Sequence, residues 1–118
     1  MKGEVKSWVI HNLGRNKLTI FIYPSLARLR RETRKPNCVG LTVVPASRRQ
    51  PISVHLPVDT SVGVAAHEAV HVAQALYRRS QAARWQKVIE NEEEERLAYP
   101  VGEVTEWIWS CIEAYHVT

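Results

Sequence analysis

The chain has 118 residues, of which 45% are hydrophobic and 24% are charged, and its formal net charge is +4. This length and composition predict one soluble globular domain spanning residues 1–118, and they exclude a low-complexity or disordered chain. No apolar stretch approaches the length that crosses a membrane, and the first residues contain no apolar run typical of a signal peptide. The two cysteines, Cys38 and Cys111, form no C-x-x-C pair, so we expect a cytoplasmic protein without a disulfide framework.

The charge is divided unevenly between the two halves of the chain. Residues 1–59 carry eleven lysines and arginines, Arg28 and Arg30 among them, against three acidic residues, whereas residues 60–118 carry five against nine. The basic half could form a nucleic-acid surface, or its charges could belong to an ordinary solvated face. The second interpretation is preferred, because the basic residues are not interleaved with aromatic ones and match no known nucleic-acid-binding motif.

The basic half is predicted to be rich in strands. Runs of β-branched and aromatic residues predict strands at 17–23, 38–45 and 51–58. A short charged helix is expected at 25–33, between the first two of these strands. Pro51 and Pro57 bound the third strand and predict that it lies at the edge of the sheet, where a missing backbone N–H does no harm.

The acidic half is predicted to be helical. A helix is expected from residues 59–61, which offer a choice of N-caps, to about Arg79, since alanine and valine recur there at helical spacing. Residues 81–90 form a weaker helical stretch, and a last helical region is expected at 91–116. Pro100 predicts a kink or a new start within that region. A β-rich half followed by a helical half indicates an α+β fold.

The segment V-A-A-H-E-A-V-H-V-A-Q, residues 64–74, contains an H-E-x-x-H motif inside the first of these helices. His67 and His71 are four residues apart, so their imidazoles lie one turn apart on the same helix face and can bind one metal ion. Glu68 is rotated from His67 by about 100°, close enough to reach a metal-bound water without being a ligand itself. This division of roles is the one that a zinc hydrolase needs.

The alternative is that the motif consists of two partly exposed helix histidines beside a surface glutamate. Its surroundings favour the metal site, because alanine and valine flank it where a solvated face would carry lysine, glutamate and glutamine. No third histidine follows in the extended three-histidine pattern. A carboxylate from 92–95 is therefore the expected third ligand, and helical periodicity leaves Glu94 and Glu95 both open.

The segment H-E-A-V-H-V-A-Q, followed by E-E-R-L-A-Y at 94–99, resembles the small H-E-x-x-H metallopeptidase-like proteins of phages and prophages, which are of the gluzincin type. The resemblance covers about residues 52–112. It implies a minimal zincin-like fold, with a small antiparallel sheet packed on the active-site helix and a second helix that carries the third ligand. It also implies a Zn²⁺ site formed by His67, His71 and Glu95, since Glu95 lies three residues before the Ala of the A-Y pair.

Two further residues are candidates for the site. The resemblance raises Tyr99 as a hydroxyl near the zinc that would steady an oxyanion, and packing between the two helices is the alternative. His55, in the third predicted strand, could face the cleft, although a single histidine in a strand is more often structural.

Together these features predict a zinc-dependent metallopeptidase-like protein that hydrolyses peptide bonds by metal-activated water, with Glu68 as the base. An extended peptide or protein substrate would add as a strand beside residues 51–58, at the edge of the cleft. One alternative is a catalytically idle zinc-binding module that recognises a host or partner protein. Another is a nucleic-acid-associated protein that uses the basic half. If the chain is phage-encoded, its expected compartment is the host cytoplasm.

Overall fold

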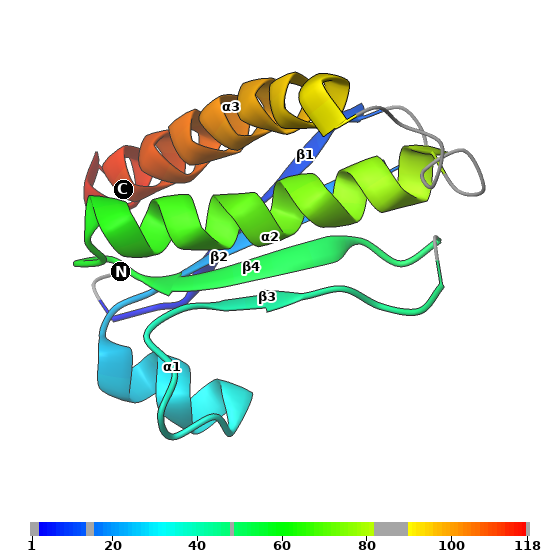
Figure 1. Cartoon of the computed structure of the whole chain (residues 1–118). Helices are drawn as coiled ribbons and strands as arrows, with labels where there is room; N and C mark the ends of the chain where they lie inside the picture. Colours follow the sequence, from blue (N-terminus) through cyan, green and yellow to red (C-terminus); the bar gives the residue numbers. More distant parts are fainter. Residues whose placement is uncertain (1–2, 14–15, 48, 82–89, 118) are drawn as a thin grey trace.

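The computed structural model describes residues 3–13, 16–47, 49–81 and 90–117, with the backbone alone described at 11–13, 80–81 and 90–100. Its elements are, in chain order, β1 (Lys6–Leu13), β2 (Asn16–Tyr23), α1 (Leu26–Thr33), β3 (Leu41–Val43), β4 (Ile52–Pro57), α2 (Val62–Gln81) and α3 (Glu90–Val117) (Figure 1). Strands in the first half and long helices in the second confirm the predicted α+β class. Most of the predicted weak helical stretch at 81–90 lies outside the described residues.

The four strands form one mixed sheet in the order β1-β2-β4-β3. The pairs β1/β2 and β3/β4 are antiparallel, whereas β2 and β4 are parallel, with Ile20 opposite Val54. The expectation of an antiparallel sheet is therefore wrong for the central pair. A parallel pair needs a crossover connection of a dozen residues or more, and α1 and β3 lie within the segment between β2 and β4.

The predicted edge strand is in fact internal. β4 lies between β2 and β3, and the described edge on that side of the sheet is the short strand β3. An internal place is compatible with these prolines, because Pro51 precedes β4 and Pro57 is its last residue. Neither proline therefore removes a hydrogen-bond donor from the middle of the strand. The next residue, Val58, still donates its backbone N–H to the carbonyl of Tyr23 at 2.8 Å.

Two strands differ from the sequence-based expectation in extent. β1 was not predicted, although it forms a hairpin with β2 and contributes Trp8 and Ile10 to the edge of the core. The strand predicted at 38–45 is reduced to Leu41–Val43. Both deviations reflect strand pairing, which depends on residues elsewhere in the chain. β1 is a strand because it pairs with β2, and β3 is limited to the three residues that pair with β4.

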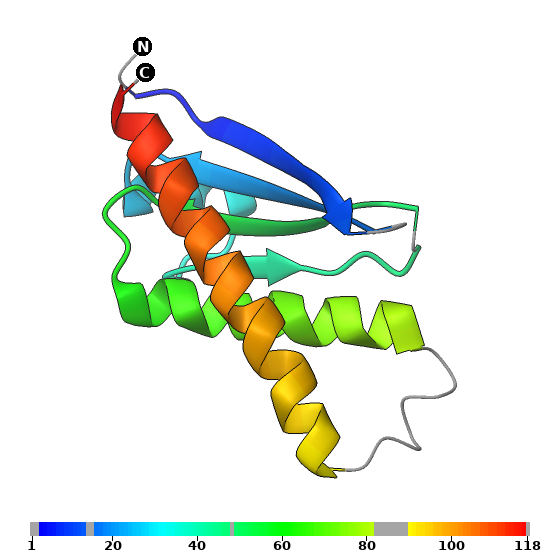
Figure 2. The ribbon, with the colours of Figure 1, turned by 90° about the horizontal axis from the view of Figure 1, so that it is seen from above.

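Helices α2 and α3 cover one face of the sheet, and α1 lies on the other side (Figures 1 and 2). The core between the sheet and the two long helices is formed by fully buried side chains, among them Leu18, Ile20, Ile22, Ile52, Val54, Leu56, Ala65, Ala69, Val72, Val104 and Ile108. In β2 and β4 the buried aliphatic residues alternate along each strand, which is the pattern of a sheet with one face on the core. The alanines of α2 have short side chains, so this helix packs close to β4.

The start of α2 is set by local chemistry, whereas α3 continues past a local stop signal. Ser61 accepts the backbone N–H of Val64 on its hydroxyl at 3.1 Å, so it is the N-cap among the three predicted choices. α3 continues through Pro100, so the predicted new start is wrong, and its ribbon shows no sharp bend in Figure 2. Proline removes one helical hydrogen bond, and burial of Val104 and Ile108 beyond it offsets that cost.

No helix in the described ranges combines the length and the apolar character needed to span a membrane.

Candidate metal centre

The two histidines of the motif lie side by side on the exposed face of α2. Their Nε2 atoms are 3.1 Å apart, and their ring centroids are separated by 4.7 Å. Two nitrogens that bind one tetrahedral zinc at about 2.0–2.1 Å are roughly 3.3 Å apart. His67 and His71 therefore need only a small adjustment to bind a single metal ion, provided that both Nε2 atoms are unprotonated.

The Glu68 side chain is directed toward β3, at the edge of the sheet. Its side chain is buried, with 6% of the residue exposed, and its Oε1 accepts a hydrogen bond of 2.7 Å from the hydroxyl of Thr42 in β3. A buried carboxylate requires such a partner, because its desolvation is otherwise costly. Thr42 thus holds the Glu68 carboxylate at a defined position against β3.

Gly40 provides the space that the Glu68 side chain occupies. A Cβ atom at Gly40 would lie 2.9 Å from Cδ2 of Leu56, 3.1 Å from Cγ of Glu68 and 3.1 Å from Cγ1 of Val64. The absence of a side chain here lets the segment before β3 approach α2 closely. The sequence carried no signal for Gly40 or Thr42, because both meet Glu68 only through contacts between residues distant in the chain.

A cleft of about 490 Å³ runs along α2 from Glu68 and His71 toward the C-terminal end of the helix. One wall is formed by β3 and the loop after it, including Thr42, Val44 and Pro45. The other wall is a face of α2, with Glu68 and His71 toward one end and, farther along, Gln74, Ala75, Arg78 and Arg79. Glu68 and His71, the predicted base and one predicted metal ligand, therefore border a cavity large enough for part of a peptide.

Arg79 holds the loop wall of this cleft in place. Its guanidinium donates to the carbonyl oxygens of Pro45 at 2.8 Å, Gln50 at 3.0 Å and Ser47 at 3.2 Å. Three carbonyl acceptors on one guanidinium fix the loop between β3 and β4 against the end of α2. Arg79 has a positioning role that sequence reasoning missed, since the loop it binds is about 30 residues away in the chain.

The predicted third ligand lies in a segment whose side chains are not among the described ones. Glu94, Glu95 and Tyr99 lie in the first part of α3, where the structure describes the backbone alone. Among the side chains that are described, no three His, Cys, Asp or Glu residues form a group that could hold a metal ion. The two histidines of α2 are the part of the predicted ligand set that the structure brings together.

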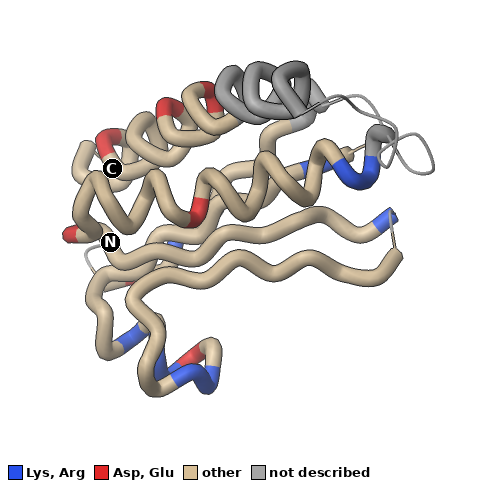
Figure 3. The backbone as a smooth tube through the Cα atoms, in the orientation of Figure 1, with Lys and Arg blue, Asp and Glu red and all other residues tan. Residues whose placement is uncertain are grey.

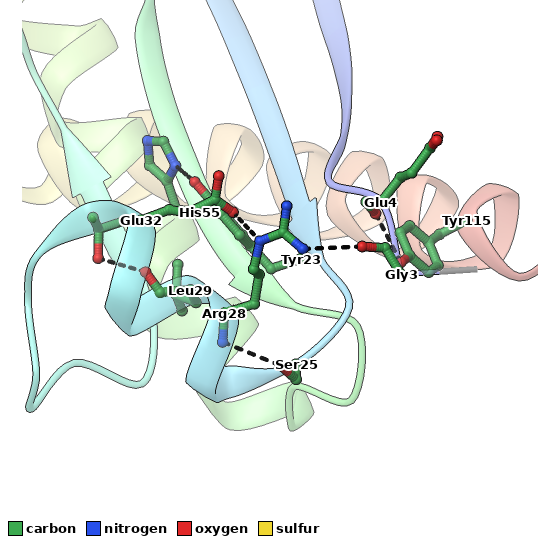
Figure 4. Close-up of polar contacts among 10 residues, drawn as sticks. Gly3, Glu4, Tyr23, Ser25, Arg28, Leu29, Glu32, His55 and Tyr115 are labelled. Atoms are coloured by element: carbon green, nitrogen blue, oxygen red, sulfur yellow. Dashed lines mark hydrogen bonds and ion pairs between the residues drawn. The ribbon is translucent and has the colours of Figure 1, made fainter. Parts of the chain in front are cut away.

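His55 does not line the cleft and lies on the opposite face of the sheet. The alternation of β4 directs Val54 and Leu56 toward α2 and α3, and His55 away from them. Its ring stacks on Phe21 with 4.7 Å between centroids, and its Nδ1 lies 2.8 Å from the hydroxyl of Tyr23 (Figure 4). The Ser53 hydroxyl lies 2.9 Å from its Nε2. Burial lowers the pKa of His55, which favours the neutral ring.

Two arginines of the basic half have structural contacts. Arg28 donates to the Glu32 carboxylate at 2.6 Å and to the carbonyl of Gly3 at 3.1 Å, which ties α1 to the start of the chain (Figure 4). Arg30 donates to the carbonyl of Cys38 at 2.9 Å, which fixes the loop before β3. Part of the positive charge around α1 (Figure 3) therefore belongs to arginines that hold neighbouring segments of the fold together.

Comparison with protein families, with curated proteins and with solved structures finds no match for this chain. The site itself combines an exposed histidine pair with Nε2 atoms 3.1 Å apart, a buried glutamate held by Thr42, and a cleft bordered by Glu68 and His71.

Proposed function

We propose that the chain is a zinc-dependent metallopeptidase-like protein that hydrolyses peptide bonds. The observation that carries this proposal is the 3.1 Å separation of the two Nε2 atoms, one residue away from a buried glutamate that borders the same cleft. A histidine pair and a carboxylate base in this order are what metal-assisted hydrolysis requires.

The donor set suits zinc. Imidazole is a good ligand for zinc, and the exposed position of His67 and His71 leaves room for further ligands. Glu95 of α3 is proposed as the third protein ligand, with Glu94 as the alternative, and Tyr99 as a hydroxyl that steadies the developing oxyanion. Bound zinc would lower the pKa of its water and polarise the substrate carbonyl.

Glu68 is the proposed general base. One of its carboxylate oxygens is occupied by the Thr42 hydroxyl, which leaves the other to accept the proton of the attacking water. The hydrogen bond from β3 restricts rotation of the carboxylate. Orientation of this kind lowers the entropic cost of reaching the reactive geometry.

The substrate is proposed to bind along β3. The structure corrects the earlier expectation that residues 51–58 form this edge, because β4 is internal and β3 pairs on one side with β4. No strand in the described part of the chain pairs with the other side of β3, which borders the cleft. An extended peptide there would gain backbone hydrogen bonds from β3 and lie beside the histidines.

The test combines metal analysis with a peptidase assay on purified protein. We expect one zinc per chain, lost in His67→Ala and His71→Ala and retained in Glu68→Gln and in the control His116→Ala. Any hydrolysis of unfolded polypeptide should fall by about 10²- to 10⁴-fold in Glu68→Gln, the range for a lost general base.

Each outcome has a distinct meaning. Full zinc content after both histidines are replaced would overturn the assigned metal site. Zinc bound without any hydrolysis would indicate the idle binding module instead of an enzyme. Tight, strongly salt-dependent binding of DNA or RNA, together with no zinc, would favour the nucleic-acid alternative.

A further inference from the structure

One face of α2 carries a line of polar side chains that extends beyond the proposed metal site. His67, His71, Gln74 and Arg78 are spaced by four, three and four residues, which places them on the same side of the helix. The last three of these residues line the cleft. The cleft therefore leads from His71 to a guanidinium at its far end.

Arg78 differs from its neighbour Arg79 in what it contacts. Arg79 is engaged with three carbonyl groups of the loop wall. Arg78 is exposed, and no acidic side chain among the described residues forms an ion pair with it. Two basic residues of α2, Arg78 and Arg79, line this end of the cleft, and Figure 3 shows basic positions at this end of the helix.

We propose that Arg78 binds an acidic side chain of the substrate, about three residues to the N-terminal side of the cleaved bond. This inference rests on the proposed peptidase function. An exposed guanidinium that borders the cleft and has no acidic partner among the described residues is complementary to a carboxylate, and the two can form a bidentate pair. Arg78 is thus a residue that determines specificity, separate from the residues that perform the reaction.

The distance of three residues follows from helix and strand geometry. Seven residues separate His71 from Arg78, which corresponds to about 10 Å along the helix axis. An extended peptide covers roughly 3.4 Å per residue, so about three residues span the same length. Val44, Pro45 and Ala75 line the cleft as well and favour apolar side chains at the positions between.

The direction follows from the topology. β3 is antiparallel to β4, and α2 returns antiparallel to β4, so β3 and α2 run in the same direction (Figures 1 and 2). A peptide that pairs antiparallel with β3, the slightly more stable mode, runs from the Arg78 end to the histidine end. Its residues near Arg78 are therefore N-terminal to the bond that reaches the metal.

The test uses two fluorescein-labelled peptide hydroxamates, Glu-Ala-Leu-NHOH and Gln-Ala-Leu-NHOH, blocked by the label at the N-terminus. The hydroxamate binds the metal in place of the scissile group and so fixes the register of the three residues. Their dissociation constants are measured by fluorescence anisotropy on the zinc-loaded protein. We expect the Glu peptide to bind about two- to fivefold more tightly than the Gln peptide, the range for an exposed ion pair.

Three comparisons complete the test. In Arg78→Gln the two peptides should bind equally, whereas the control Arg31→Gln, which removes an exposed arginine of α1, should keep the preference. In Arg78→Glu the preference should reverse. Raising the salt concentration should reduce the difference for the wild type, because exposed charges are screened.

The outcomes separate this inference from the proposed function. Equal binding of the two hydroxamates by the wild type, or a preference that persists in Arg78→Gln, would overturn the role of Arg78 and leave the metal site intact. A protein that binds neither zinc nor hydroxamate would overturn the peptidase proposal and the specificity with it.

Discussion

Thr42 of β3 donates a hydrogen bond of 2.7 Å to the carboxylate of Glu68 in α2, and this contact joins residues 26 positions apart in the chain. It connects the edge strand that borders the cleft to the residue that follows His67. Because Glu68 is buried, the bond both stabilises the fold and fixes the position of the proposed base.

Replacing Thr42 by Val should test this connection, since valine has the same shape and lacks the hydroxyl. The Glu68 carboxylate would lose a hydrogen-bond donor, and the free energy of unfolding should fall by about 1–3 kcal/mol. Any peptidase activity should fall mainly through kcat, because the base loses its orientation. Thr42→Ser keeps the donor and is the matched control in urea unfolding and in the assay. Equal stability of the two variants would contradict the role of the hydrogen bond.

Gly40→Ala should destabilise the protein by about 1–3 kcal/mol, the usual cost of overpacking. The added Cβ would lie within 3.1 Å of three side chains, Leu56, Glu68 and Val64, of which Leu56 is fully buried. Gly102→Ala is the control, because nothing lies within 4 Å of a Cβ at that position of α3. That change should stabilise the helix by about 0.5–1 kcal/mol. Urea unfolding measures both, and a neutral Gly40→Ala would show that α2 and β3 can separate without cost.

Glu95→Gln should weaken zinc binding more than about 100-fold, the upper end of the cost of losing an outer-shell partner. The amide is a poor zinc ligand compared with the carboxylate. Glu92→Gln and Glu93→Gln make the same change in charge nearby and should leave the affinity unchanged. A competition titration with a chelator measures all three. A loss in Glu94→Gln instead would mean that the ligand is the neighbouring glutamate.

His55 should make stability depend on pH below neutrality. Burial lowers the pKa of His55 in the folded state, whereas a histidine in the unfolded chain has a pKa of about 6.5. The unfolded state therefore binds more protons as the pH falls below about 6.5, and the free energy of unfolding decreases in that range. Above that pH both states are neutral at this position, and its contribution is constant.

The measurement compares urea unfolding of the wild type and His55→Gln at several pH values between neutrality and about pH 5. The variant should lose less stability on acidification than the wild type, because the glutamine does not titrate. The other histidines are present in both proteins, so their contributions cancel in the comparison. Identical pH dependence of the two proteins would show that His55 titrates normally in the folded state.

Local chemistry determined where α1 and α2 begin. Ser25 caps α1 by accepting the N–H of Arg28, and Ser61 caps α2 in the same way, so both starting points could be predicted from the residues. The spacing of His67 and His71 is also local, since a helix of 3.6 residues per turn brings positions four apart together whatever surrounds them. Their 3.1 Å separation needed only the helix.

Tertiary structure alone decided the arrangement around that pair. Strand pairing joins distant segments, so the parallel contact of β2 with β4 and the internal place of β4 depend on which strands bury their aliphatic faces together. Prolines at the ends of a strand are compatible with an edge or an internal place, and the sequence does not distinguish them. The partners of Glu68 come from Gly40 and Thr42, more than 25 residues away, because the sheet edge must pack on α2. The sequence by itself determined that His67 and His71 share one face of a helix, and packing determined which residues hold Glu68 and border the cleft.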